Sequence, residues 1–211
     1  MSDPSPGAGW ARDVRAVVDD LLPLLAAVPD DAWERPASGL TWTCRETAAH
    51  ILDDLLAYAM QLSGDHGTGA DYVPLAEAHQ VREGGPAFWL WPEPASGSTG
   101  IAVSLDATAG VFAAVLASVP ADRVGWHPWG PTDATGFAAM GLTETVLHAW
   151  ELLTAQGVSW TADADVTARV LDRIFPAAPR GADPWTDLLS ATGRAAKTRG
   201  MPWRWDAAVR G

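Results

Sequence analysis

Three residues of this sequence have the types and spacing of a metal site. Glu144 and His148 share one mostly apolar segment, and His50 lies in another. Glu144 and His148 are four residues apart, so on a helix their side chains leave the same face one turn apart. Two imidazoles and one carboxylate suit Zn²⁺, and three protein ligands leave one coordination position open for water or substrate. We therefore predict a divalent-metal site, with zinc as the expected ion.

The surroundings of Glu144 support this prediction. Its neighbours include Met140, Leu142 and Val146, and burying a carboxylate among apolar side chains is costly unless a cation or a strong donor compensates it. An ion shared with His148 would do so. Each residue alone also has a plainer interpretation, as a packed histidine or a solvated helix carboxylate. The combination favours the metal.

Further residues are candidates for the same site. Asp54 follows His50 by one helical turn and would orient a ligand or move a proton, unless it faces solvent. His127 lies in an aromatic loop and would act as an acid or base. Arg82 would meet an anionic substrate or cofactor, or lie on the surface. An apolar cofactor pocket would draw its walls from the tryptophans Trp42, Trp89, Trp91, Trp126, Trp129 and Trp150.

Cys44 is the single cysteine, which excludes an internal disulfide and is compatible with a reducing compartment. It precedes His50 by six residues, or roughly 240° around a helix, so the two side chains should not face one point. A helix N-terminus could lower its pKa. We expect a small buried structural thiol instead.

The elements that must position these residues are helices. Apolar residues recur at helical spacing in four segments, and Thr43 with Glu46 has the pattern of a capping box. Pro23 is expected to kink or divide the first helix. We predict an all-α protein: an antiparallel four-helix bundle in residues 1–157 and a short, mostly helical C-terminal extension in residues 158–211, packed on or near it. The bundle helices are expected at about 10–28, from 41 or 43 to 62, from 100 or 104 to 118, and at 135–155, and those of the extension at about 163–175 and 184–192.

Composition excludes several classes of partner. The 211 residues are 48% hydrophobic and carry a net charge of −12, so a substantial core is expected and a nucleic-acid backbone would be repelled. We expect no membrane span, because no apolar run reaches the roughly 18 to 20 residues that one requires, and the first residues have no secretory signal pattern. We expect a cytoplasmic monomer or homodimer that binds small molecules.

The segment from Trp42-Thr43 to His50 and the Glu144-x-x-x-His148 pair resemble the DinB/YfiT-like bundle superfamily, and most closely the mycothiol-dependent maleylpyruvate isomerase family of actinobacteria. The resemblance covers about residues 10–155. It implies that His50, Glu144 and His148 bind a divalent metal, usually zinc. Two departures weaken the case for maleylpyruvate as the substrate. Family members often continue His-x-x-Asp where this chain has His148-Ala149-Trp150-Glu151, and the isomerase has a fuller C-terminal domain.

The resemblance also implies a borrowed nucleophile. A low-molecular-weight thiol such as mycothiol would occupy the open metal position and attack a small electrophile, giving cis–trans isomerisation or S-transfer. Two other functions stay open. The metal could activate water for hydrolysis, or the bundle could be a metal-stabilised, non-catalytic binder of a small molecule.

Overall fold

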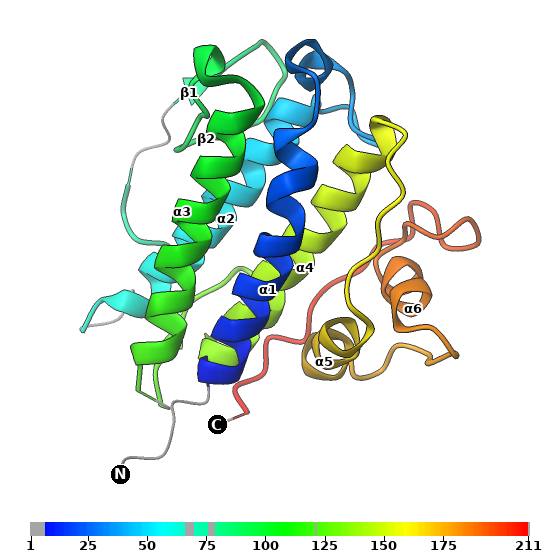
Figure 1. Cartoon of the computed structure of the whole chain (residues 1–211). Coiled ribbons are helices and arrows are strands. Elements are labelled where there is room, and N and C mark those ends of the chain that lie inside the picture. The colour runs from blue at the N-terminus through cyan, green and yellow to red at the C-terminus, as the bar shows by residue number, and fades with distance from the viewer. Residues whose placement is uncertain (1–6, 66–69, 76–78, 121, 211) are drawn as a thin grey trace.

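Helices make up most of the protein in the computed structural model, which describes residues 7–65, 70–75, 79–120 and 122–210 (Figure 1). The predicted all-α bundle is confirmed. Its four long helices are α1 (Gly7–Ala26), α2 (Cys44–Ser63), α3 (Gly97–Ser118) and α4 (Ala134–Ala155), and the shorter α5 (Ala164–Ile174) and α6 (Pro184–Ala191) follow.

Short elements fill the connections between the helices. Two 3₁₀ turns precede α2 and α3, and each of two antiparallel pairs contains strands of two residues. The second pair leads directly into α4. These elements are η1 (Asp30–Glu34), β1 (His79–Gln80), β2 (Ala87–Phe88), η2 (Pro94–Ser96), β3 (Val124–Gly125) and β4 (Thr132–Asp133).

Each bundle helix has one antiparallel and one parallel neighbour. Helix α1 runs antiparallel to α3, and α2 runs antiparallel to α4 (Figure 1). The end of α4 lies beside the start of α2, as the hydrogen bond from Gln156 Nε2 to the Cys44 sulfur at 3.3 Å shows. Helix α3 starts at the same end of the bundle as α2 (Figure 1). This topology places α2 and α4 side by side in opposite directions.

Two local predictions about helix ends and breaks have different outcomes. The capping box is confirmed: the Glu46 amide donates to Thr43 Oγ1 at 3.1 Å, and the Thr43 amide donates to Glu46 Oε2 at 2.8 Å. Of the two effects expected of Pro23, the division of the first helix is wrong, since α1 continues through it, while a kink stays a prediction. Pro23 is exposed, so water can satisfy the carbonyl that loses its partner, while Leu21 and Leu25 pack in the core on either side.

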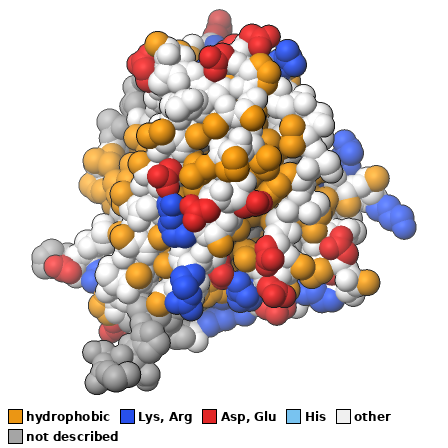
Figure 2. All heavy atoms as spheres, viewed as in Figure 1, with side chains coloured by type: hydrophobic (Ala, Val, Ile, Leu, Met, Phe, Trp, Pro, Cys, Tyr) orange, Lys and Arg blue, Asp and Glu red, His pale blue; other side chains and the backbone are white. Residues whose placement is uncertain are grey.

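Helix α3 contradicts the expectation that no apolar run is long enough to span a membrane. Residues Pro94–Ser118 are long and apolar enough to cross a membrane by length and composition. The core helix of a bundle passes the same test, and α3 does bury Leu105, Phe112 and Leu116 against the other helices. Val103 lies on its outer face, and Figure 2 shows hydrophobic side chains scattered among charged ones on the side where α1 and α3 lie. The cytoplasmic location and the oligomeric state stay predictions.

The C-terminal extension packs against the same chain's bundle. Helix α5 contacts α4, and α6 contacts α5. The last residues then pass between α5 and the bundle toward the start of α4 (Figure 1): the Asp206 amide donates to the Ile174 carbonyl at 2.8 Å, and the Arg210 amide donates to Asp133 at 2.6 Å. Helix α4 is therefore covered on both sides, which explains why it is apolar nearly all round.

Candidate metal centre

The three predicted ligands converge between α2 and α4. Glu144 Oε2 lies 2.9 Å from His148 Nε2 and 3.5 Å from His50 Nε2. One ligand atom from each of the three residues lies within 4.8 Å of the others. Atoms bound to one tetrahedral zinc at about 2.0–2.1 Å lie roughly 3.3 Å from each other. The two measured separations bracket this value, so the donor set fits a divalent ion.

Behind His148 lies a second carboxylate. His148 Nδ1 is 2.6 Å from Glu151 Oε2, so the ring nitrogen that faces away from the other ligands is held by an acid. This carboxylate–histidine arrangement fixes the tautomer and orientation of a metal-binding imidazole. The other oxygen of Glu151 accepts from Arg194 Nε at 2.8 Å. The rear of the site is therefore a chain of polar contacts that is buried at His148 and Glu151 and partly exposed at Arg194.

In front of His50 lies a cavity. Asp54 Oδ2 is 3.3 Å from His50 Nε2, the same nitrogen that faces Glu144. Asp54 is thus on the ligand side of the ring. Both residues line a cavity of about 260 Å³, together with Asp53, Ala57, Tyr58, Tyr72, Ala87 and Trp89. Of the three candidate ligands His50 lines the cavity, so a small molecule there would reach the site through His50 and Asp54.

The pKa shifts of Glu144, His148 and His50 show which positive charge a divalent ion would replace. Burial alone would raise the pKa of Glu144, but hydrogen bonds to His148 and His50 hold it well below its usual range. Burial alone would lower the pKa of His148, but Glu144 and Glu151 raise it to about 9. For His50, burial is likewise outweighed by Asp54 and Glu144, and its pKa is raised. Without a cation, the neighbouring carboxylates therefore favour the protonated form of both imidazoles. A divalent ion would supply the same positive charge.

The pKa of Asp54 reflects a different balance between burial and nearby charge. Burial raises its pKa to about 7, although the nearby charge of His50 opposes this shift. A carboxylate with a pKa near neutrality can both accept and release a proton. Burial also raises the pKa of Tyr58 well above its ordinary value, so its phenol is neutral at the cavity wall.

Aromatic side chains enclose the ligands. The Trp42 ring stacks on His148 with centroids 6.4 Å apart and meets His50 edge-on at 5.1 Å. Trp89 lies on the far wall of the cavity. Its segment is tied to α2, because Asp53 accepts hydrogen bonds from the Trp89 and Leu90 amides at 2.9 and 2.7 Å.

Three other predicted site residues lie outside this cavity lining. His127 is buried against Tyr58 and Trp205, and burial lowers its pKa to about 4, so the ring is neutral. Arg82 donates two hydrogen bonds to Glu46 and is 44% exposed. Trp150 packs edge-on against Trp185, with ring centroids 6.2 Å apart. The catalytic role of His127 and the cofactor contacts of Arg82 and Trp150 stay predictions.

The rest of the tryptophan group and the cysteine have structural contacts. Trp91 packs on Phe88, and Trp126 meets Tyr72 edge-on. Cys44 is fully buried, and burial raises the pKa of its thiol. The expectation of a structural thiol agrees with this environment.

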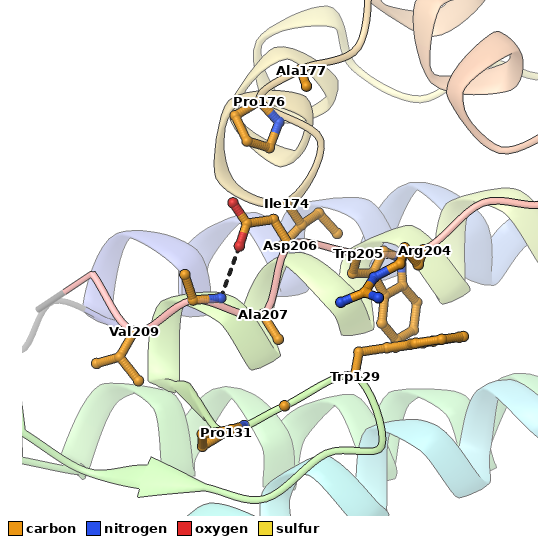
Figure 3. Close-up of a pocket in the computed structure, with 12 residues that line it drawn as sticks. Trp129, Pro131, Ile174, Pro176, Ala177, Arg204, Trp205, Asp206, Ala207 and Val209 are labelled. Carbon is orange, nitrogen blue, oxygen red and sulfur yellow. Dashed lines mark hydrogen bonds between the residues drawn. The ribbon is translucent and has the colours of Figure 1, made fainter.

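A larger hollow of about 560 Å³ lies elsewhere, between the loop around Trp129, the end of α5 and the C-terminal segment (Figure 3). The Arg204 guanidinium lies over the Trp129 ring, 5.7 Å from its centroid, and Trp205 forms part of the wall. None of the candidate ligands lines it. Size alone therefore does not locate the chemistry of this protein.

Sequence reasoning missed several residues around the site. Glu151 follows His148 by three residues, and that spacing alone would have placed both on one helix face. Tyr58 follows Asp54 by four residues and offers the same signal. Asp53 follows His50 by three residues and offers it too. The approach of Tyr72 to the cavity and of Arg194 to Glu151 carries no local signal, since only tertiary packing brings these residues to the site.

The bundle and its cluster of two histidines and one carboxylate define a helical protein with a candidate divalent-metal centre that faces a cavity. A family model described as the mycothiol maleylpyruvate isomerase N-terminal domain matches residues 14–153, and the chain belongs to this family. The matched region contains the three candidate ligands, Asp54 and Glu151, and it ends before the C-terminal extension. No curated protein and no solved structure matches the chain.

Proposed function

We propose that this protein is a zinc-dependent enzyme that uses a low-molecular-weight thiol, such as mycothiol, to attack a small electrophile. His50, Glu144 and His148 would hold the ion. The reaction would be either S-transfer or cis–trans isomerisation. The family supports a mycothiol-related isomerase or transferase, and the arrangement of the site supports the dependence on a metal.

One observation supports the proposal most directly: ligand atoms of His50, Glu144 and His148 lie close together, with a supporting carboxylate on one side and a cavity on the other. Glu151 occupies the rear ring nitrogen of His148, whereas the front faces the cavity of about 260 Å³. A structural zinc site is closed by four protein ligands, while a catalytic one keeps a position free. The cavity provides the room that a thiol and an electrophile need.

A divalent ion in this position would keep a bound thiol as the thiolate at neutral pH, which is its nucleophilic form. Asp54 lies beside the ligands, and its pKa near 7 lets its carboxylate take the thiol proton. Tyr58, Tyr72 and Trp89 line the cavity in which the thiol and the electrophile would meet. If the sulfur adds to an activated alkene, rotation and release of the thiol complete an isomerisation. If the sulfur displaces a leaving group, the adduct is the product.

Metal analysis combined with a thiol-conjugation assay tests this function. Wild type should bind one zinc per chain, whereas His50→Ala, Glu144→Ala and His148→Ala should each lose it. Glu83→Ala is the matched control, since Glu83 is an exposed carboxylate outside the site. Wild type should then conjugate mycothiol to a small electrophile, and the zinc-free variants should not.

Three outcomes would contradict the proposal. Full zinc content in all three ligand variants would remove the assigned site. Turnover of the electrophile in the absence of any thiol would favour metal-activated water and hydrolysis. Zinc binding without turnover for thiol-reactive substrates of several classes would favour the non-catalytic binding bundle.

A further inference from the structure

We propose that Arg194 of the C-terminal extension is a positioning residue of the metal centre: it fixes Glu151, which in turn orients His148 toward the ion. This inference rests on the proposed metal site. It assigns a role to the extension, which lies outside the segment that matches the family.

A continuous series of short contacts links the extension to the ligands. Arg194 Nε donates to Glu151 Oε1 at 2.8 Å, and Glu151 Oε2 lies 2.6 Å from His148 Nδ1. His148 Nε2 then lies 2.9 Å from Glu144 Oε2. Each oxygen of Glu151 has its own partner. The carboxylate therefore cannot rotate without breaking a contact, and the direction of the imidazole follows from it.

Burial distinguishes this pair from an ordinary surface ion pair. The side chain of Glu151 is 4% exposed and that of Arg194 is 15% exposed. Exposed pairs contribute little, but removing one partner from a buried pair leaves an uncompensated charge. Without Arg194, one oxygen of Glu151 would have to find another donor. Any movement of the carboxylate toward water would pull on His148.

The backbone turn before Arg194 and the packing of its side chain place the guanidinium beside Glu151. Gly193 has a φ of 68°, a left-handed conformation that favours glycine and turns the chain after α6. A Cβ on Gly193 would lie 2.8 Å from the Met201 carbonyl oxygen. The Arg194 amide donates to Leu189 at 2.8 Å, and its guanidinium lies over the Trp203 ring, 5.9 Å from the centroid. These contacts fix both ends of the side chain.

The chain offers a matched control five residues away. Arg199 lines the same hollow of about 320 Å³ as Glu151, Trp150 and Arg194. Within the part of the chain that the structure describes, its side chain forms no ion pair and no hydrogen bond. Replacing Arg199 thus removes one positive charge from the same hollow without touching Glu151.

The test compares zinc affinity in Arg194→Gln, Arg194→Lys and Arg199→Gln, by competition with a chromophoric chelator. Arg194→Gln should weaken zinc binding by about tenfold or more, as is typical when a partner of a metal-binding histidine is lost. Arg194→Lys keeps the charge but not the planar fork, so it should fall between Arg194→Gln and wild type. Arg199→Gln should bind zinc as wild type does.

Cobalt substitution separates positioning from simple stabilisation. If Arg194 orients His148, the visible absorption of the cobalt form should change in Arg194→Gln and stay unchanged in Arg199→Gln. If Arg194 only anchors the extension, the metal-free variant would melt earlier while its zinc affinity and cobalt spectrum stayed at wild-type values, which overturns the inference. Should Arg194→Gln fail to fold, Arg194→Lys decides by the same two measurements.

The failure of this inference can be told from the failure of the proposed function. If wild type takes up no zinc, the metal site itself is wrong and the inference falls with it. If wild type binds zinc and both Arg194 variants match it, only the role of Arg194 is refuted.

Discussion

The α2 and α4 halves of the candidate metal centre use the same residue types in opposite ways. Each half has a histidine followed by a carboxylate about one helical turn later: His50 with Asp54, and His148 with Glu151. The two side chains on α2 are 28% and 19% exposed, whereas those on α4 are 8% and 4% exposed. Asp54 meets the ligand side of its histidine, while Glu151 meets the rear nitrogen.

Helix direction explains the contrast. Because α2 and α4 run antiparallel, one turn toward the C-terminus leads to opposite ends of the site. On α2 it leads toward Tyr58 and the cavity. On α4 it leads toward the C-terminal extension and Arg194. One carboxylate thus becomes available to a substrate, and the other becomes part of the support of a ligand.

The largest expected effect comes from deleting each histidine in the absence of metal. His148→Ala should lower the free energy of unfolding by about 3 kcal/mol, because it leaves the nearby buried carboxylates without their partner. His50→Ala should lower it by about 1 kcal/mol or less, since water can reach that half. Urea unfolding with a chelator present measures both. Equal losses would mean that the two halves do not differ as described.

Exchanging each carboxylate for its amide should separate the two roles. Glu151→Gln should weaken zinc binding by about 10- to 100-fold. Asp54→Asn should leave zinc affinity within about threefold and slow thiol transfer by about 100-fold, the lower end of the range for a lost acid or base. Calorimetric titration with zinc and steady-state kinetics give the two readouts. A drop in zinc affinity for Asp54→Asn as large as for Glu151→Gln would make Asp54 a ligand or support.

The α4 half should also control how stability depends on pH. In the metal-free protein the folded pKa of His148 is about 9, above its unfolded value of about 6.5. The resulting stabilisation is complete below the unfolded pKa and is lost as pH rises toward 9. Zinc affinity should increase over the same interval, because binding displaces a proton from His148.

Urea unfolding at several pH values between 6.5 and 9, with chelator, checks this trend. His148→Ala should flatten it. A wild-type stability that rises across this interval would contradict the description of the cluster.

The smallest effect should come from the wall of the open half. Asp53→Ala removes the acceptor for the Trp89 and Leu90 amides. It should cost about 1 kcal/mol of stability and raise KM more than it lowers kcat, since the cavity wall loosens while the ligands stay in place. Zinc content should match wild type. A loss of zinc would show that the wall also supports His50.

Local spacing could be predicted well for this protein because helix geometry relates residues three or four positions apart. The apolar periodicity predicts the four bundle helices, the capping box marks the start of α2, and the Glu144–His148 spacing places both side chains on one face. Of the two alternatives at Pro23, the division of the helix was wrong, since local propensity takes no account of core packing around an exposed proline.

Only the tertiary structure decided how the halves differ. His50 meets Glu144 across 94 positions of sequence, and Arg194 meets Glu151 across 43. Sequence by itself determined which residues could serve as ligands and which could face the same way along one helix. The direction in which α2 and α4 pass each other, and the return of the extension to α4, follow from burying several apolar faces at once. As a result, Asp54 lies on the side of the site that faces the cavity, and Glu151 supports His148 from the opposite side.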